Sequence, residues 1–230
     1  MSNLYDAPVP FVGVGTGRCG SHTLVEIISA CKNTNVYHET INVPWYEPGA
    51  SPELGVLMKR LINARKLGLL AGEVSPSIIN SVGVLRGDIP GLKVVCLHRG
   101  REQVVRSFCE YGVNMPPLRP LERHRWAEGC LGAHYGDAKI PLSFPVIDGA
   151  SRQQAISFYW EMYESMMREV AEPVMHIHIE ALNDAKAVES LFEFLDIPVC
   201  DRVFIEVRKF WSISDSEEAK MANPRRKPDA

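Results

Sequence analysis

The first residues that could do chemistry form a glycine-rich loop near the N-terminus. An apolar stretch at 9–14 precedes the run Gly15-Thr16-Gly17-Arg18-Cys19-Gly20-Ser21-His22-Thr23, and apolar spacing typical of a helix begins at Ser21. At such a junction, free backbone N–H groups and the helix dipole favour an anion. Arg18 adds a permanent positive charge. The loop therefore predicts a phosphate-like ligand held by Gly17, Arg18, Cys19, Gly20, Ser21, His22 and Thr23.

Two other phosphate chemistries use loops of this kind. The ATPase signature G-x-x-x-x-G-K-[ST] is nearly matched from Gly15 onwards, but its lysine is absent, which disfavours ATP hydrolysis. The dinucleotide pattern G-x-G-x-x-G is complete, and Glu39 follows where a ribose-binding acid would lie. A Rossmann-type oxidoreductase that binds NAD(P) or a flavin is therefore an alternative.

A second segment with anion-binding chemistry lies at a later strand-to-helix junction. It reads LHRGREQVVRSF at 97–108, with Arg99 directly after a predicted strand and Ser107 inside the predicted helix. This arrangement resembles the 3′-phosphate-binding segment of sulfotransferases that use 3′-phosphoadenosine 5′-phosphosulfate (PAPS). The first loop is similar to the 5′-phosphosulfate loop of the same family. The pair matches one donor with an anionic group at each end.

Further segments extend the resemblance, which is closer to carbohydrate and tyrosylprotein sulfotransferases than to the cytosolic phenol and steroid type. The run 72–76 (GEVSP) resembles their G-E-K-[ST]-P segment, and 179–182 with 194–195 resembles their C-terminal ending. The sequence departs from the family pattern in three ways. Arg18 stands where the cytosolic branch has lysine, Val74 replaces a common lysine, and no clear G-x-x-G-x-x-K is present near the C-terminus.

The resemblance implies that a sulfuryl group passes from PAPS to a hydroxyl or amine by in-line displacement, which releases adenosine 3′,5′-bisphosphate. Arg18 would stabilise the leaving phosphate, and Glu39 resembles the glutamate base of the family. His38 is the rival base. Glu73 is a second candidate base, for which orienting the substrate or bracing the loop is the favoured interpretation. A non-catalytic nucleotide-binding module of the same fold is a further alternative.

Composition limits the partners. The formal net charge of −3 gives no global attraction to nucleic acid or anionic membranes. The six cysteines form no C-x-x-C pair, and the sequence shows neither a leader nor a membrane-spanning run. These features predict a cytoplasmic protein without a metal, and the resemblance implies a small-molecule, carbohydrate or lipid acceptor. His176 and His178 share a strand face, but the spacing marks no third ligand.

The elements that must position these residues alternate along the chain. Strands are predicted at 9–14, 35–38, 67–74, 92–97 and 174–179. Helices are predicted at 21–30, 52–66, 102–111, 152–170 and from a cap at 183 or 184 to 195. This alternation predicts an α/β fold, a three-layer parallel sheet with helices on both faces. The resemblance adds that it is a P-loop-like sulfotransferase domain.

A single domain is expected over 1–230, with an irregular insertion or lid at 112–150 and a polar tail at 212–230. The insertion carries the densest internal basic cluster, for which a solvated surface is the favoured interpretation: Arg119, Arg123, His124 and Arg125. A second set of basic residues lies toward the C-terminus, where it could reach a 3′-phosphate or be ordinary surface charge: Arg208, Lys209 and 225–227.

Overall fold

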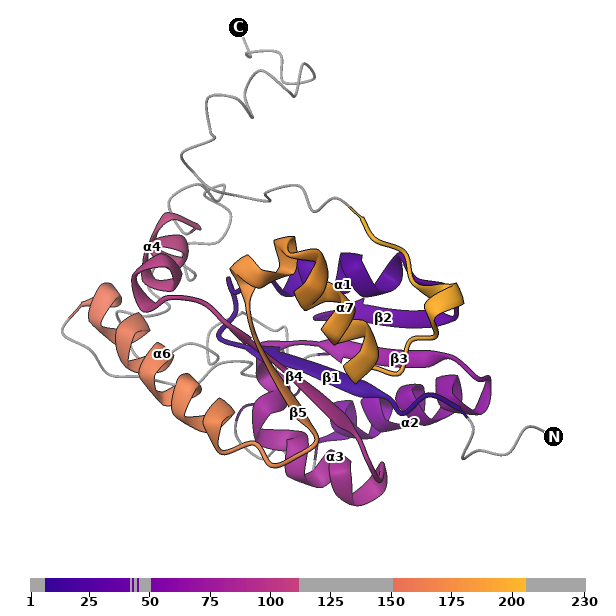
Figure 1. The fold of residues 1–230 in the computed structure, drawn as a ribbon. Coiled ribbons are helices and arrows are strands. Elements are labelled where there is room, and N and C mark those ends of the chain that lie inside the picture. The colour runs from indigo at the N-terminus through magenta and orange to yellow at the C-terminus, as the bar shows by residue number, and fades with distance from the viewer. Residues whose placement is uncertain (1–6, 42, 44, 46–50, 112–150, 206–230) are drawn as a thin grey trace, which may run out of the picture.

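The strands of this α/β protein form one parallel sheet. The computed structural model describes residues 7–41, 43, 45, 51–111 and 151–205. Its five strands follow the order β2-β3-β1-β4-β5, and each neighbouring pair is parallel (Figure 1). Their bounds are Phe11–Gly15 for β1, Thr34–His38 for β2, Leu70–Val74 for β3, Lys93–His98 for β4 and Val174–His178 for β5. The carboxyl ends of all these strands therefore lie along one edge.

Helices cover both faces of the sheet and complete three layers (Figure 1). On one face lie α1 (Ser21–Ser29) and α7 (Ala185–Phe194), whose apolar side chains share a core with the strands. On the other face lie α2 (Pro52–Lys66), α3 (Val82–Asp88) and α6 (Arg152–Arg168). The helix α4 (Arg101–Tyr111) packs against α6.

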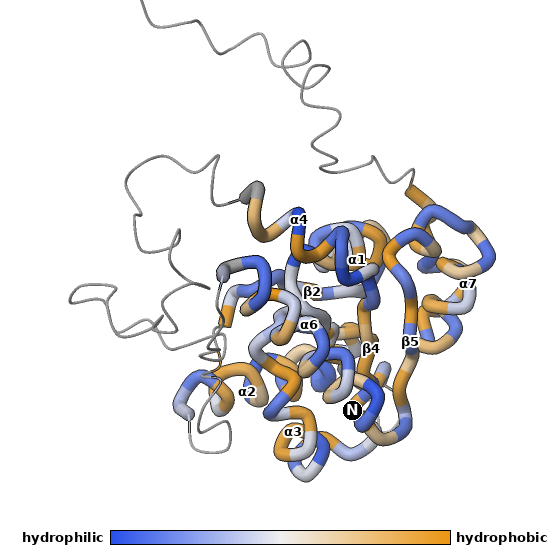
Figure 2. The backbone as a smooth tube through the Cα atoms, turned by 90° about the vertical axis from the view of Figure 1, so that its left-hand side faces the viewer, coloured by the Kyte–Doolittle hydropathy of each residue, from blue (hydrophilic) through white to orange (hydrophobic). Residues whose placement is uncertain are grey.

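The central strands are apolar because both of their faces are covered. Every residue of β1 and β3 is buried, and β4 is buried after Lys93. Figure 2 shows the same pattern in the apolar colour of β4. Continuous apolar runs of this kind are typical of parallel strands inside an α/β sheet, and they are the signal from which the strands were predicted.

The predicted parallel α/β sheet with helices on both faces is confirmed. The third strand begins at Leu70 rather than at residue 67, because Leu67 and Gly68 form a turn after α2. The predicted cap of the last helix is confirmed at Asp184, whose carboxylate accepts a hydrogen bond from the backbone N–H of Lys186 at 2.9 Å.

One part of the fold was not predicted. No helix or strand is predicted between 74 and 92, where the structure has a 3₁₀ helix, η1 (Pro76–Ser81), followed by α3. The helix α3 is short and contains Gly83 and Gly87, which lower helix propensity. Two further 3₁₀ helices are η2 (Ile179–Asn183) and η3 (Val199–Asp201).

Several predicted features lie outside the described residues: the insertion at 112–150, its basic cluster, the tail at 212–230 and the C-terminal basic residues. Among the helices that the structure does describe, none is long and apolar enough to cross a bilayer.

Candidate functional site

The predicted site residues gather at the carboxyl edge of the sheet. Register pairs Gly15, the last residue of β1, with Leu97 of β4, and it pairs Val74, the last residue of β3, with His38 of β2. The glycine-rich loop, Glu39 and the second segment follow β1, β2 and β4, so all three lie along one edge of the sheet. In open α/β sheets, ligands bind at this edge where neighbouring connections diverge.

The glycine-rich loop between β1 and α1 is a tight turn. Gly17, Arg18 and Gly20 have positive φ angles of 76°, 54° and 87°. At Gly20 a Cβ atom would lie 2.4 Å from Cδ1 of Ile179, so a larger residue would clash as well as strain the backbone. For the non-glycine Arg18 the left-handed conformation costs about 1 kcal/mol, which the contacts around the loop must offset.

Two buried tyrosines of α6 form hydrogen bonds to the backbone of this loop. The hydroxyl of Tyr159 donates to the carbonyl of Thr16 at 2.9 Å. The hydroxyl of Tyr163 donates to the carbonyl of Pro76 at 2.8 Å and accepts from the N–H of Gly15 at 3.2 Å. Tyr163 thus joins the ends of β1 and β3. The helical spacing of these tyrosines indicated core packing, and it gave no signal for their hydrogen bonds to the loop.

The two predicted anion segments contact each other directly. Nε of Arg18 donates to the hydroxyl of Ser107 at 3.1 Å, and Nη1 of Arg99 donates to the backbone carbonyl of Arg18 at 2.6 Å. The indole N–H of Trp160 donates to the carbonyl of Arg99 at 2.9 Å and so fixes the backbone there. The buried Nε of Arg99 has no hydrogen-bond partner within the described parts of the chain.

A histidine pair flanks the first turn of α1. Nε2 of His38 lies 2.7 Å from the hydroxyl of the buried Ser21, and the His38 ring stacks on His22 with centroids 3.7 Å apart. Burial, with a smaller contribution from the charge of His22, lowers the pKa of His38 to about 4. The imidazole is therefore neutral at pH 7, and the exposed His22 covers it.

Glu39 directly follows β2 and turns the chain with a φ of 49°. Its backbone N–H donates to the carbonyl of Val74 at 3.0 Å. Its side chain is 43% exposed, and Oε1 lies 3.6 Å from Nε2 of His38. Ser21 and Glu39 thus approach the same nitrogen of His38. A Ser-His-acid triad needs them on opposite nitrogens, so this cluster lacks the arrangement of a serine hydrolase.

Glu73, the second residue expected at the substrate, is buried on β3. Its side chain has no exposed surface, so in this conformation it does not reach an acceptor. The carboxylate faces Thr40 and Arg60 instead. Burial raises the pKa of Glu73, while hydrogen bonds from Thr40 and the charge of Arg60 act in the opposite direction.

The other predicted loop residues are buried. Cys19 is 1% exposed, and burial raises the pKa of its thiol to about 11. It is protonated at neutral pH and is not an activated nucleophile. Thr23 is buried in the first turn of α1, as Ser21 is.

A chain of acidic and histidine side chains beside Arg99 was not anticipated. Nδ1 of His98 lies 2.9 Å from the buried Glu164 carboxylate, and Nε2 lies 2.9 Å from Nδ1 of His176. The His178 ring is 5.5 Å from that of His98. Only His176 and His178 were considered from the sequence, because their partners lie on other elements. No group of three or more residues in the described ranges is arranged to hold a metal ion.

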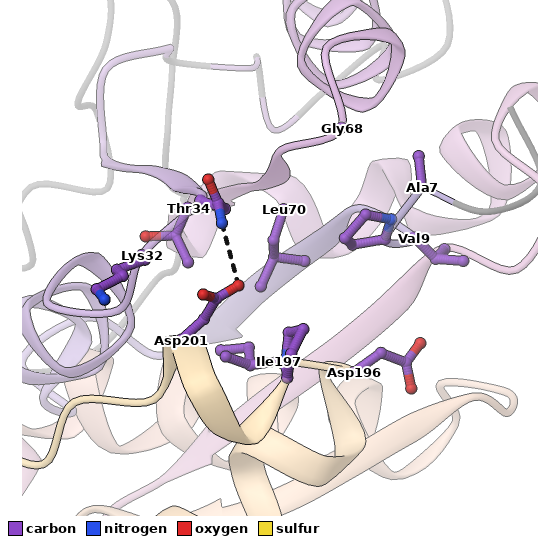
Figure 3. A pocket seen from close by; sticks show the side chains of 12 residues that line it. Ala7, Val9, Lys32, Thr34, Gly68, Leu70, Asp196, Ile197 and Asp201 are labelled. Carbon is purple, nitrogen blue, oxygen red and sulfur yellow. Dashed lines mark hydrogen bonds between the residues drawn. The ribbon is translucent and has the colours of Figure 1, made fainter. Parts of the chain in front are cut away.

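A pocket of about 380 Å³ lies at the opposite edge of the sheet (Figure 3). Its lining comes from the segments before β1, β2 and β3, from the first residues of β2 and β3, and from the chain after α7, including Val9, Lys32, Leu70 and Ile197. A hydrogen bond of 3.1 Å between Asn33 and Asp201 crosses it. It shares no residue with the site at the carboxyl edge.

Comparison with models of known protein families and with curated proteins finds no match for this chain.

Proposed function

We propose that this chain is a sulfotransferase that uses PAPS as sulfuryl donor and belongs to the P-loop-like sulfotransferase fold. The observation that carries the proposal is the direct contact between the two arginine-bearing segments. Arg18 and Arg99 come from loops after adjacent strands. Arg18 donates to the hydroxyl of Ser107, and Arg99 donates to the backbone carbonyl of Arg18. One ligand with two anionic groups would contact both segments, as a nucleotide with a 5′-phosphosulfate and a 3′-phosphate does.

In the proposed reaction the acceptor oxygen or nitrogen forms a bond to sulfur while the bond between sulfur and the phosphate bridge oxygen breaks. The phosphate of adenosine 3′,5′-bisphosphate leaves with the negative charge. Arg18 and the N–H groups at the start of α1 would stabilise that charge. The proton of the acceptor passes to a carboxylate base.

Glu39 is better suited than His38 to be that base. Nε2 of His38 is already at hydrogen-bond distance from Ser21, and the His22 ring stacks on the His38 imidazole. Glu39 has an exposed carboxylate beside it. A neutral His38 that donates from Nε2 would leave the hydroxyl proton of Ser21 available for the donor phosphate.

The order of the strands argues against the Rossmann alternative. In the dinucleotide-binding order 3-2-1-4-5-6, the second strand lies next to the first, which brings the ribose-binding acid near the glycine-rich loop. Here β3 lies between β1 and β2. Glu39 therefore follows a strand that is not the neighbour of β1.

A thermal-shift panel tests this proposal against the alternatives. Adenosine 3′,5′-bisphosphate should raise the melting temperature, whereas adenosine 5′-monophosphate, NAD⁺ and FAD at equal concentration should raise it much less. A ligand at 100 times its Kd adds about 2.7 kcal/mol to the free energy of unfolding. Stabilisation by NAD⁺ or FAD alone would contradict the proposal. Binding without turnover of PAPS, across sugars, phenols, lipids and amines as acceptors, would support the non-catalytic module.

A further inference from the structure

The buried carboxylate of Glu73 is linked to the segment that carries Glu39. Oε1 accepts a hydrogen bond from the backbone N–H of Thr40 at 2.8 Å, and Oε2 accepts one from the Thr40 hydroxyl at 2.9 Å. Arg60 of α2 donates to Oε2 at 3.0 Å. Both oxygens accept and neither donates, which is the pattern of an ionised carboxylate.

These contacts lie one residue beyond Glu39. The N–H of Glu39 is held by the carbonyl of Val74, and the next N–H, that of Thr40, is held by Glu73. Both anchors belong to β3. Glu39 itself has the left-handed backbone conformation, which a glutamate does not favour. A turn of this kind persists only where its neighbours fix it.

Arg60 links the same turn to α2, in the helix layer on one face of the sheet. Its guanidinium lies over the ring of Tyr37 at 4.5 Å from the centroid while it donates to Glu73. Tyr37 is two residues before Glu39 on β2. The strand before Glu39 and the residue after it are therefore joined through one partly buried ion pair.

We propose that Glu73 is a positioning residue: through Thr40 it fixes the left-handed turn at Glu39 and so directs the Glu39 carboxylate toward the acceptor. This inference rests on the proposed sulfotransferase activity, because it assigns to Glu39 a proton to accept. Glu73 itself touches neither donor nor acceptor.

Glu73→Gln is the variant that tests it, because it keeps the size of the side chain and removes the charge. The side-chain amide of the variant could not accept all three hydrogen bonds that Glu73 accepts, because its –NH₂ group would face the donors of Thr40 or Arg60. Amide hydrogen exchange at Thr40, followed by NMR, should become faster by about tenfold. Glu26→Gln, an exposed position on α1, is the matched control and should leave exchange at Thr40 unchanged.

Turnover of PAPS supplies the second readout. We expect Glu73→Gln to lower kcat by about 10- to 100-fold while the Kd for adenosine 3′,5′-bisphosphate stays within about twofold of wild type. Should Glu73→Gln fail to fold, Thr40→Val removes the exposed residue's hydroxyl, which donates to Glu73 and accepts from Arg60. It keeps the backbone N–H that Glu73 holds, so it should change exchange and kcat in the same direction by less.

The outcomes separate the inference from the function on which it rests. If the wild type binds adenosine 3′,5′-bisphosphate but the variants leave exchange at Thr40 unchanged, the positioning role is wrong and the proposed function stands. Faster exchange with unchanged kcat would also overturn the role. If the wild type does not bind the nucleotide, the proposed function fails and the catalytic part of the inference fails with it.

Discussion

Arg18 and Arg99 supply the positive charge of the proposed site. They lie close enough that Arg99 donates to the carbonyl of Arg18, and Arg18 reaches Ser107. An arginine fork can bind a phosphate through two parallel hydrogen bonds. An anion bound between the two segments would accept hydrogen bonds from both arginines.

At the same scale, Glu39→Gln should remove the proposed base while keeping the side-chain shape. General-base catalysis contributes typically 10²- to 10⁴-fold, so we expect kcat to fall by about that range. The Kd for adenosine 3′,5′-bisphosphate should not change, because the base faces the acceptor. Initial rates of PAPS turnover with a screened acceptor, compared with His38→Gln, measure the effect. A larger loss in His38→Gln than in Glu39→Gln would reverse the assignment of the base.

His38 also predicts a dependence of stability on pH. Its pKa is about 4 in the folded protein, against 6.5 for an unperturbed histidine. Between these values the unfolded state binds the proton and the folded state does not, so stability rises with pH. The free energy of unfolding should fall by about 1 to 2 kcal/mol from pH 7 to pH 5 on account of this residue.

Urea denaturation of the wild type and of His38→Gln at both pH values isolates this contribution. The variant should show a smaller loss of stability between pH 7 and pH 5. Equal losses in both proteins would mean that the imidazole of His38 is not held neutral in the folded state.

At the scale of elements, α6 supports the site without contributing a side chain to the proposed chemistry. The hydroxyl of Tyr163 bonds to the backbone of Gly15 and of Pro76, at the ends of two adjacent strands. Trp160 bonds to the backbone after β4. The helix therefore bonds to the chain at or just after the carboxyl ends of β1, β3 and β4.

Tyr163→Phe should lower the free energy of unfolding by about 1 to 3 kcal/mol. The cause is that a buried N–H and a buried carbonyl lose their partner while the ring still fills its space. Tyr37→Phe is the matched control, because the Tyr37 ring meets Arg60 and that contact does not need the hydroxyl. Chemical denaturation of both variants gives the comparison, and a Tyr163→Phe effect no larger than that of Tyr37→Phe would contradict the bracing role.

The elements with a strong local signal were predictable from the sequence. Apolar runs gave the buried strands, and the acid at Asp184 gave the cap of α7. The helix α3 was missed because it is short and has two glycines. Of the candidate site, the loop residues were predicted from motif spacing and Glu39 from the family resemblance, and their roles stay predictions. The bonds from Tyr159 and Tyr163 and the contacts of Glu73 with Thr40 were not predicted, because they join elements far apart in the sequence.

At the scale of the whole molecule, the strand order decides which residues meet. With β1 at the centre and β3 and β4 beside it, the glycine-rich loop, the end of β3 and Arg99 share one edge. The pocket at the amino edge lies at the other end of the strands. A nucleotide that spans both arginine segments is therefore expected at the carboxyl edge.

Isothermal titration with adenosine 3′,5′-bisphosphate tests this account most directly. The comparison uses wild type, Arg99→Ala and Arg168→Ala, the last an exposed control near the end of α6, with adenosine 5′-monophosphate as the ligand that lacks the 3′-phosphate. We predict that wild type and Arg168→Ala bind the bisphosphate much more tightly than the monophosphate. Arg99→Ala should lose about tenfold or more in affinity for the bisphosphate alone. Equal affinity for the two nucleotides, or no binding of either, would contradict the proposed function.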